Sequence, residues 1–433
     1  MRLYAPSVLL LHLICITVES SQFPPNLCGS SCPSLASYAQ LHREIVRGEE
    51  TITAPSTAGI AATLLPGQQR WLVSVAVEAG LTDRLVGIMS EFFMALLSER
   101  ALSITSYDPL PPFEAAFAPA QIDWTRRPTT GSVDDWDSIV EPLKYTYRGV
   151  RGYVGQRPLR HNSSDIALLY LVNDHRANEF FSYENVGDWP KGSRHARVLF
   201  VASNRGRISQ LFSNPHHKRS LRELGFRPET ALCCAWQYLF APSLSVRQSM
   251  SREFDALHER HNELKIAVTI RVGDAAFHAD ADTETLARAI AKPYFRCAEQ
   301  IEEWAFRASS YRRVVWYVTS ESLALRRWAK ATYGRKVLTN DYARYGHGDC
   351  FHERNGECLS DDARNASIVA AAGQLYALSM CHYHIHLRDS GFGRFAAWVS
   401  GQWRNSYAIP RKSACGQDNY DRFSESAGEW SGI

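Results

Sequence analysis

Short apolar runs of six or seven residues alternate along the chain with longer segments in which apolar residues recur every three or four positions. Trp71–Val77 has the first pattern, and Leu85–Leu97 follows it with the second. The first pattern predicts buried strands and the second predicts amphipathic helices that pack on them. Such alternation is typical of parallel sheets covered by helices.

The alternation divides the chain into two halves that meet near residues 243–250. In the first half the predicted strands are 71–77, 101–105 and 196–202, with a helix at 85–97 and short helical segments up to 242. In the second half the predicted strands are 265–271, 313–319, a short strand near 336 and 382–388, and the predicted helices are 283–306, 321–332, 364–380 and 393–403. The pattern therefore predicts an α/β protein with two doubly wound, Rossmann-like halves around a central cleft.

Both ends of the chain depart from this pattern. Residues 1–20 have a positive start at Arg2 and an apolar core at Val8–Val18, which predicts an export signal peptide; a retained membrane anchor is the alternative. The predicted segments are a signal peptide at 1–20, a loosely ordered stem at 21–65, a first α/β domain at 66–245, a second at 246–405 and a tail at 406–433.

Composition narrows the location and the partners. The net charge of +3 is too small to indicate a nucleic-acid partner. Ten cysteines and the glycosylation sequons at Asn162 and Asn365 fit an oxidising secretory compartment. Local bridges are plausible within two pairs, although spacing alone leaves the connectivity open: Cys28 with Cys32, and Cys350 with Cys358.

The segment Lys265–Asp274 carries the strongest chemical signal. Its apolar run is a predicted buried strand that delivers Arg271 to its carboxyl end, where ligands bind in open α/β sheets. The guanidinium of Arg271 has a planar fork suited to phosphate oxygens. Gly273 permits a sharp turn, and Asp274 can cap the turn. The alternative is a surface arginine that closes a core strand and pairs with the nearby aspartate.

Three further loops follow predicted strands. Ser320 and Glu321 precede a helix, and helix capping is the alternative to ligand binding there. The turn Arg388–Arg394 contains two glycines that allow close ligand approach, and its serine could start an anion-binding turn. Ser203–Gly206 is the corresponding loop of the first half.

The order of these motifs resembles that of the fucosyltransferase superfamily with GT-B folds, which includes protein O-fucosyltransferases, α1,6-fucosyltransferases and plant xyloglucan fucosyltransferases. The resemblance covers roughly residues 70–405. Ile270–Asp274 is similar to the first donor motif of these enzymes, Thr319–Glu321 to the second, and the segment from 364 to 393 to the third. Gly80–Arg84 is similar to their N-terminal glycine loop, and Ser203–Arg207 to a loop of the plant-type members.

The resemblance implies an inverting enzyme with an acceptor-side first domain and a nucleotide-sugar-binding second domain, in which Arg271 contacts the pyrophosphate and is the catalytic residue. It implies these donor-binding residues: Arg271, Gly273, Asp274, Ser320, Glu321, Ser390, Gly391, Phe392 and Gly393. It implies these possible cleft residues: Gly80, Asp83, Arg84, Asn204 and Arg205. Positive charge for the leaving diphosphate would come from the protein, so no metal and no cofactor is expected. Three departures from the family pattern leave donor choice and activity open: Thr269, Glu321 and Gln374.

A catalytic base is not identified by any motif. Asp83, Asp123 and Glu114 lie in the acceptor half and are candidates, each with a solvated or capping carboxylate as the alternative. Asp280-Ala-Asp282 matches a metal-dependent pattern, but its place before a helix favours capping. Three histidines alternate along one predicted strand without a matching distant ligand, so no metal site is predicted at His382, His384 and His386.

The sequence thus predicts a glycosyltransferase that moves fucose from GDP-fucose to a hydroxyl of a glycan or glycoprotein, in the Golgi or endoplasmic reticulum lumen or outside the cell. Its partners would be the nucleotide sugar and the acceptor, with no nucleic acid, and a membrane only if residues 1–20 remain as an anchor. Two alternatives stay open: a non-catalytic carbohydrate-binding protein that retains the fold, and an enzyme that uses another nucleotide sugar.

Overall fold

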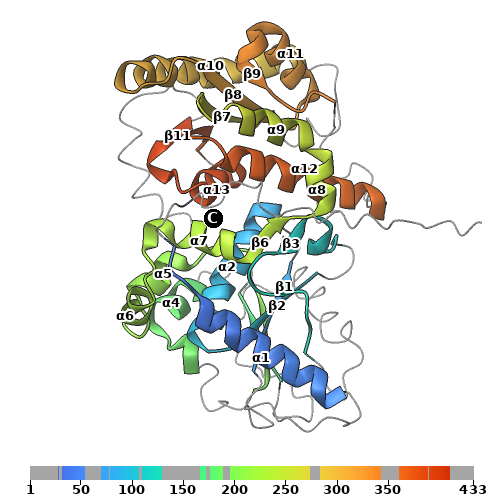
Figure 1. The fold of residues 1–433 in the computed structure, drawn as a ribbon, viewed down its shortest axis with the longest axis vertical. Coiled ribbons are helices and arrows are strands. Elements are labelled where there is room, and N and C mark those ends of the chain that lie inside the picture. The colour runs from blue at the N-terminus through green and yellow to red at the C-terminus, as the bar shows by residue number, and fades with distance from the viewer. Residues whose placement is uncertain are drawn as a thin grey trace, which may run out of the picture.

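The computed structural model describes residues 28, 32–53, 70–77, 79–106, 110–128, 166–171, 176–188, 196–273, 283–342, 360–388 and 390–409. Within them lie two parallel sheets and a small antiparallel pair at the junction between the sheets (Figure 1). The strands are β1 (Trp71–Ala76), β2 (Ala101–Ser106), β3 (Phe117–Pro119), β4 (Ile166–Tyr170), β5 (Val198–Ala202), β6 (Phe240–Pro242), β7 (Leu264–Ile270), β8 (Val314–Ser320), β9 (Val337–Leu338), β10 (Tyr383–Leu387) and β11 (Ser406–Ile409).

Helices connect these strands and cover the sheets. The α-helices are α1 (Ala36–Thr53), α2 (Leu81–Leu97), α4 (Arg176–Tyr183), α5 (Ile208–Ser213), α6 (Lys218–Glu223), α7 (Pro228–Leu239), α8 (Leu244–Ser249), α9 (Ser251–Glu259), α10 (Thr283–Ala308), α11 (Leu323–Tyr333), α12 (Asp361–Ser379) and α13 (Gly391–Val399). Short 3-10 turns are η3 (Phe113–Ala115), η4 (Val186–Asp188), η6 (Gly334–Lys336) and η8 (Trp403–Asn405). None of the helices in the described part of the chain has both the length and the apolar character needed to span a bilayer.

The first sheet has the strand order β2-β1-β5-β4, and all of its neighbouring strands run parallel. The chain adds β2 beside β1, crosses to the far edge for β4, and then places β5 between β4 and β1. The loops after β1 and β5 therefore leave the sheet side by side at its carboxyl edge. In open α/β sheets, ligands bind beyond the carboxyl ends of the strands.

The second sheet has the order β11-β10-β7-β8-β9 and is also entirely parallel. Its first strand in the chain, β7, is central, and the order reverses between β7 and β10. The prediction of an α/β fold with two doubly wound sheets is thus confirmed. The predicted tail from residue 406 was wrong at its start, because Ser406–Ile409 forms the edge strand β11.

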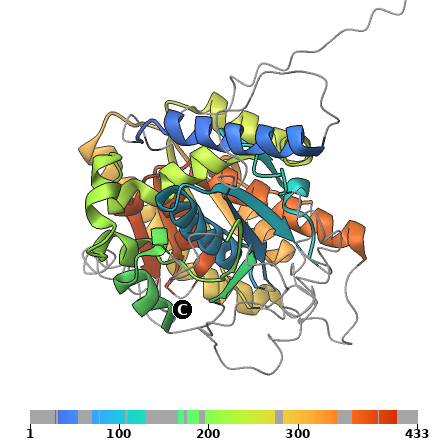
Figure 2. The ribbon, with the colours of Figure 1, turned by 90° about the horizontal axis from the view of Figure 1, so that it is seen from below.

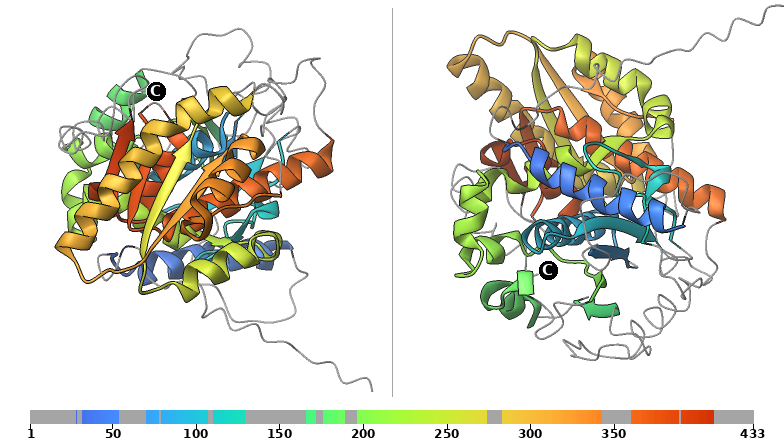
Figure 3. Two further views of the ribbon diagram at one scale, coloured as in Figure 1. Left: turned by 90° about the horizontal axis from the view of Figure 1, so that it is seen from above. Right: turned by 60° about the horizontal axis from the view of Figure 1, so that its bottom comes forward.

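Two apolar cores stabilise the molecule. One lies between the second sheet and the helices α10 and α11, which cover its outer face (Figure 3). The other is continuous from the first sheet to the inner face of the second, because α12 and α13 lie between them. The strand β7 alternates between these cores, with Ile266 and Val268 in the outer one and Ala267 in the inner one. A strand buried on both faces has the continuous apolar run that the sequence showed.

The predicted stem contains a structured element. Helix α1 runs alongside the first sheet (Figure 2) and packs on β2. Its buried face donates a hydrogen bond from the Tyr38 hydroxyl to the Arg100 carbonyl, and His42 bonds the Leu102 carbonyl. The expectation of a loosely ordered segment was wrong here. Helix α1 has many charged residues, so the narrow apolar stripe that it buries is difficult to recognise in the sequence.

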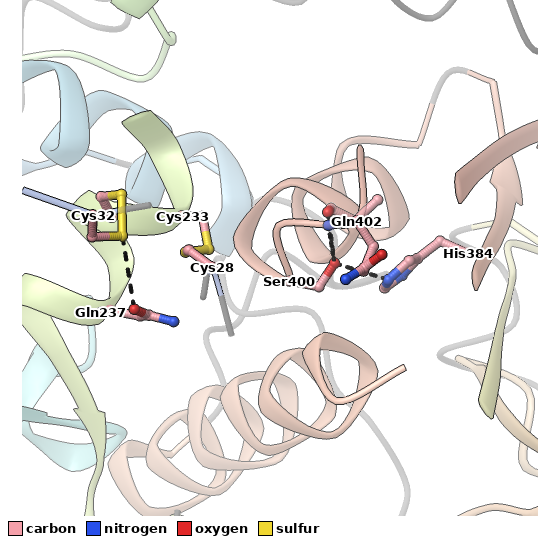
Figure 4. The surroundings of a disulfide bond; sticks show 9 residues. Cys28, Cys32, Cys233, Gln237, His384, Ser400 and Gln402 are labelled. Carbon is pink, nitrogen blue, oxygen red and sulfur yellow. Dashed lines mark hydrogen bonds between the residues drawn. A yellow bond between two sulfur atoms is a disulfide. The ribbon is translucent and has the colours of Figure 1, made fainter. Parts of the chain in front are cut away.

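Two disulfides link the segment that precedes α1 to helix α7. Cys28 bonds Cys233 and Cys32 bonds Cys234 (Figure 4). The plausible local bridge between Cys28 and Cys32 was therefore wrong, because the helix α7 presents two neighbouring cysteines to that segment. Cys350 and Cys358 lie outside the described residues. Disulfides that close loops of about 200 residues restrict the unfolded chain strongly.

Candidate active site

The carboxyl ends of β7 and β10 lie side by side at the reversal point of the second sheet. In the paired register Thr269 stands opposite His386, so Arg271 and Arg388 follow at the same level of the sheet. Two of the predicted loops are thus brought together, the one that carries Arg271 and the one that begins α13. Asp274, Asp280 and Asp282 lie outside the described residues.

Glu321 holds the loop after β7. One carboxylate oxygen, Oε1, accepts hydrogen bonds from the amides of Val272 and Gly273, both at 2.6 Å, and lies 3.6 Å from Nη1 of Arg271. The Glu321 side chain is 4% exposed, whereas that of Arg271 is 33% exposed. Gly273 has a φ of +129°, which a side chain would strain. The buried Glu321 carboxylate therefore holds the loop from its inner side, and the Arg271 side chain stays partly exposed to solvent.

Ser320 supports this arrangement rather than capping the next helix. Its hydroxyl donates to Oε2 of Glu321 at 3.4 Å and accepts from the Ser322 amide at 3.3 Å. The N-cap of α11 is Ser322, whose hydroxyl accepts from the Leu325 amide. The alternative that Ser320 caps this helix is wrong, because the cap lies two residues later. Both Ser320 and Glu321 are buried, so they position the loop from within the protein.

The first turn of α13 lies directly on β7 and β10. A Cβ added to Gly393 would lie 2.4 Å from Cβ of His386 and 3.2 Å from Cβ of Thr269, so only glycine allows this approach. Ser390 is the N-cap, but its hydroxyl makes no capping hydrogen bond. The amides of Gly391, Phe392 and Gly393 have no acceptor within the helix, as at any helix start, and such amides favour an anion.

The carboxyl edge of the first sheet between β1 and β5 is built from α2 and the loop after β5. Gly87 of α2 allows the Ser203 carbonyl to approach, since a Cβ there would lie 2.3 Å from that oxygen. The Ser90 hydroxyl accepts a hydrogen bond from the Arg207 amide at 2.8 Å. Asn204 is buried in this loop and Arg205 is partly exposed. Gly87 and Ser90 were not among the predicted residues, although a glycine inside a helical pattern often marks a close approach.

The carboxyl edges of the two sheets meet where α13 begins. A Cβ on Gly391 would lie 3.3 Å from Oγ1 of Thr82 and 3.6 Å from Oδ1 of Asp83, both in the first turn of α2. A Cβ added to Gly80, which precedes α2, would lie 3.2 Å from Oδ2 of Asp83. Predicted residues from both halves of the chain are therefore adjacent at one junction.

The charged residues of this junction differ in exposure. Arg84 is 1% exposed and its guanidinium lies 5.9 Å from the centroid of the Phe113 ring, so it faces the interior. Asp83 is partly exposed, and burial raises its pKa above the ordinary value while Arg205 and then Arg84 oppose that rise. Burial raises the pKa of Glu91, one helical turn beyond Gly87, well above its ordinary value. Its carboxyl lies near Ser74 and the backbone of Ser203 without forming a well-shaped hydrogen bond.

Other candidate residues have structural partners. The histidines of β10 are separately engaged, with His386 bonded to the Ser406 hydroxyl at 2.8 Å and His384 to the Ser400 hydroxyl at 3.0 Å (Figure 4 shows the latter). Burial lowers the pKa of His384 to about 3 and that of His386 to about 4, so both rings are neutral. Trp124 is buried and its indole N–H donates to the Leu239 carbonyl, so its ring packs in the core.

Gln374 and Asn365 both lie on α12. Gln374 is buried and its side-chain carbonyl accepts from the Tyr317 hydroxyl at 2.8 Å. Asn365, the asparagine of one sequon, is partly exposed on the wall of a groove of about 650 Å³. This groove is lined by Ala115, Ser245, Gln248, Ser249, Asn365, Ala366 and Val369. Asn162, of the other sequon, lies outside the described residues.

Known structures share this architecture. The chain resembles the structure of an Arabidopsis thaliana FUT1 mutant in complex with GDP, with a TM-score of 0.54, 18% identity, and coverage of 87% of this chain and 79% of that one. The protein has a fucosyltransferase-like GT-B fold. The predicted fold class is thereby confirmed.

Other similarities are weaker. The fucosyltransferase NodZ from Bradyrhizobium matches at a TM-score of 0.37 and 14% identity over 76% of this chain and 93% of that one. The structure of POFUT1 in complex with GDP matches at a TM-score of 0.35 and 12% identity, over 80% of this chain and 98% of that one. No protein-family model and no curated protein matches the chain.

Proposed function

We propose that this protein is an inverting glycosyltransferase that moves fucose from GDP-fucose to a hydroxyl of a glycan or glycoprotein in the secretory pathway. The proposal rests chiefly on one observation: Arg271 and the first turn of α13 flank the reversal point of the second sheet, and the first turn of α2 in the first domain adjoins them. The fold shared with FUT1 and the GDP in that complex support the choice of donor.

In this proposal the donor pyrophosphate binds between Arg271 and the amides of Gly391–Gly393. The guanidinium can form two parallel hydrogen bonds with phosphate oxygens, and the helix start adds fixed positive charge. Both groups stabilise the charge that develops on the departing diphosphate, and both are held in place before the reaction. The reaction as proposed requires no metal ion, and the acceptor would enter from the first domain.

Nucleotide binding tests the donor assignment. We expect calorimetry to detect GDP and GDP-fucose in preference to GDP-mannose and UDP-galactose, with affinities unchanged by EDTA. Preference for another nucleotide sugar would identify a different donor. Binding to no nucleotide would contradict the proposal and favour a carbohydrate-binding protein that retains the fold.

The variant Arg271→Ala tests the site itself. Loss of charge-assisted hydrogen bonds worth about 1.5–3 kcal/mol should weaken GDP binding roughly 10- to 100-fold and reduce fucose transfer at least as much. The control is Arg219→Ala on α6, where an exposed arginine pairs only with Glu223. Unchanged GDP affinity in Arg271→Ala would contradict the placement of the donor.

A further inference from the structure

Asp83 is the acidic group that the two sheets bring to their shared junction. It stands in the first turn of α2, its Oδ1 lies 3.6 Å from the Cβ position of Gly391, and its side chain remains partly exposed. We propose that Asp83 is the general base that accepts the proton of the acceptor hydroxyl. This inference rests on the proposed function and assigns the residue that no sequence motif identifies.

The carboxylate is available for a substrate. Within the described part of the chain, no side chain or amide donates a hydrogen bond to Asp83, and no basic nitrogen lies within ion-pair distance of it. Glycines flank it on both sides, Gly80 from its own helix start and Gly391 from α13. A Cβ at either position would lie within 3.6 Å of a carboxylate oxygen, so these glycines leave the oxygens accessible.

The surrounding charges suit a base that must ionise and then accept a proton. Burial raises the pKa of Asp83, while Arg205 of the loop after β5 and Arg84 of α2 keep the anion attainable. The first turn of α13 presents Gly391 to it and no ionisable group, since the Arg394 guanidinium donates to the Arg388 carbonyl. A raised pKa brings a carboxylate closer to the value at which general bases are efficient.

The other carboxylates of the first domain fit this role less well. Asp123 accepts hydrogen bonds from the Thr125 hydroxyl at 2.5 Å and from Arg126 at 2.9 Å, and these contacts lower its pKa despite partial burial. Glu114 is exposed on η3. Glu91 is buried behind the Ser203 backbone and is 1% exposed, so a substrate cannot reach it.

The chemical step is balanced with these groups alone. The acceptor oxygen forms a bond to the anomeric carbon of fucose as the bond from that carbon to the β-phosphate oxygen breaks. The hydroxyl proton passes to Asp83, and the electron pair of the broken bond leaves on GDP. No oxidant, reductant or further reactant is needed. Arg271 and α13 act on the diphosphate, and Asp83 acts on the acceptor.

The variant Asp83→Asn removes the base and preserves the shape of the side chain. We expect kcat for fucose transfer from GDP-fucose to fall about 100- to 10,000-fold, the usual contribution of general base catalysis. GDP affinity should stay within about 3-fold of the wild type. A matched control is Glu229→Gln, since Glu229 is an exposed acid in the first turn of α7.

The pH profile gives a second readout. Only the ionised carboxylate accepts a proton, so wild-type kcat/KM should decrease as pH falls through the raised pKa of Asp83. That acidic limb should be absent in Asp83→Asn and present in Glu229→Gln. Retention of full activity and of the limb in Asp83→Asn would overturn the assignment, as would loss of the limb in Asp123→Asn or Glu114→Gln instead.

The outcomes separate this inference from the proposed function. If wild-type protein binds GDP and transfers fucose but Asp83→Asn does so equally well, only the assignment of the base fails. If the wild type binds no nucleotide, the proposed function fails first. Thermal unfolding of Asp83→Asn identifies a folding defect, and Asp83→Glu, which keeps a carboxylate, should then retain part of the activity that Asp83→Asn loses.

Discussion

At the scale of single residues, neighbours decide what a charged side chain does. Glu321 is a predicted donor-binding residue, but its carboxylate is buried and accepts hydrogen bonds from the amides of Val272 and Gly273. In the proposed site it therefore acts on the donor through the loop that carries Arg271. Glutamate has a longer side chain than aspartate, and this lets the Glu321 carboxylate reach that loop from the end of the neighbouring strand β8.

We expect Glu321→Ala to weaken GDP binding about 10- to 100-fold, because two amides and a guanidinium lose an acceptor worth about 1.5–3 kcal/mol. Glu321→Gln keeps one acceptor oxygen and should lose less. Calorimetry with GDP measures both effects. Glu263→Gln is the control, since this buried carboxylate lies beside Arg260 and Arg313 at the opposite end of β7. Equal affinity in all three variants would exclude a positioning role for Glu321.

At the scale of elements, α13 is the part that joins the proposed donor site to the first domain. Its start lies on β7 and β10 and against the first turn of α2, and its apolar face packs on α7. The position of its amides depends on Gly393, where the backbone approaches the Cβ of His386. His386 belongs to β10, and this strand cannot move away from Gly393 without disturbing the sheet.

Gly393→Ala should displace α13 and cost about 1–3 kcal/mol of stability, the usual effect of overpacking. GDP affinity should fall because the anion-binding amides move. The control Gly187→Ala also crowds a neighbouring element, with its Cβ 3.0 Å from the Leu97 carbonyl oxygen, but it lies in η4, away from the proposed donor site. Thermal unfolding and GDP calorimetry distinguish the two: a Gly393→Ala protein with normal GDP affinity would contradict the role of α13.

At the scale of the whole molecule, the two sheets share one apolar core. The Trp236 ring of α7 lies 4.8 Å from that of Tyr376 on α12 and 5.6 Å from that of Phe395 on α13, measured between centroids. The disulfides to Cys233 and Cys234 attach the N-terminal segment to the same helix. Such an interface resembles the inside of one domain more than a hinge.

We therefore expect the protein to unfold in one cooperative transition. Trp236→Ala, which opens a large cavity in the shared core, should lower the stability of the entire molecule by about 3–5 kcal/mol. Scanning calorimetry of wild type and variant measures this. Two separate transitions, with only one displaced in the variant, would show that the domains unfold independently.

The sequence predicted the elements whose pattern is strong within a few neighbouring residues. The strand that ends at Ile270 was recognisable because burial on both faces leaves a continuous apolar run. The helices that follow Ser360 and Ser390 were recognisable because burial along one stripe leaves a local periodicity. Helix α1 and the edge strand β11 were missed, since their stability comes from partners far along the chain.

The sequence by itself determined which residues follow the ends of strands, and so placed Arg271 in a loop and Gly393 at a strand-to-helix turn, on the side of the sheet where ligands bind in open α/β folds. The tertiary structure alone decided that Gly391 meets Asp83, that Glu321 supports the Arg271 loop and that Cys28 pairs with Cys233. The physical reason is that periodicity reports only how each residue faces its own element. Which loops become neighbours depends on strand order and on the packing of α13 between the sheets, and these are properties of the folded chain.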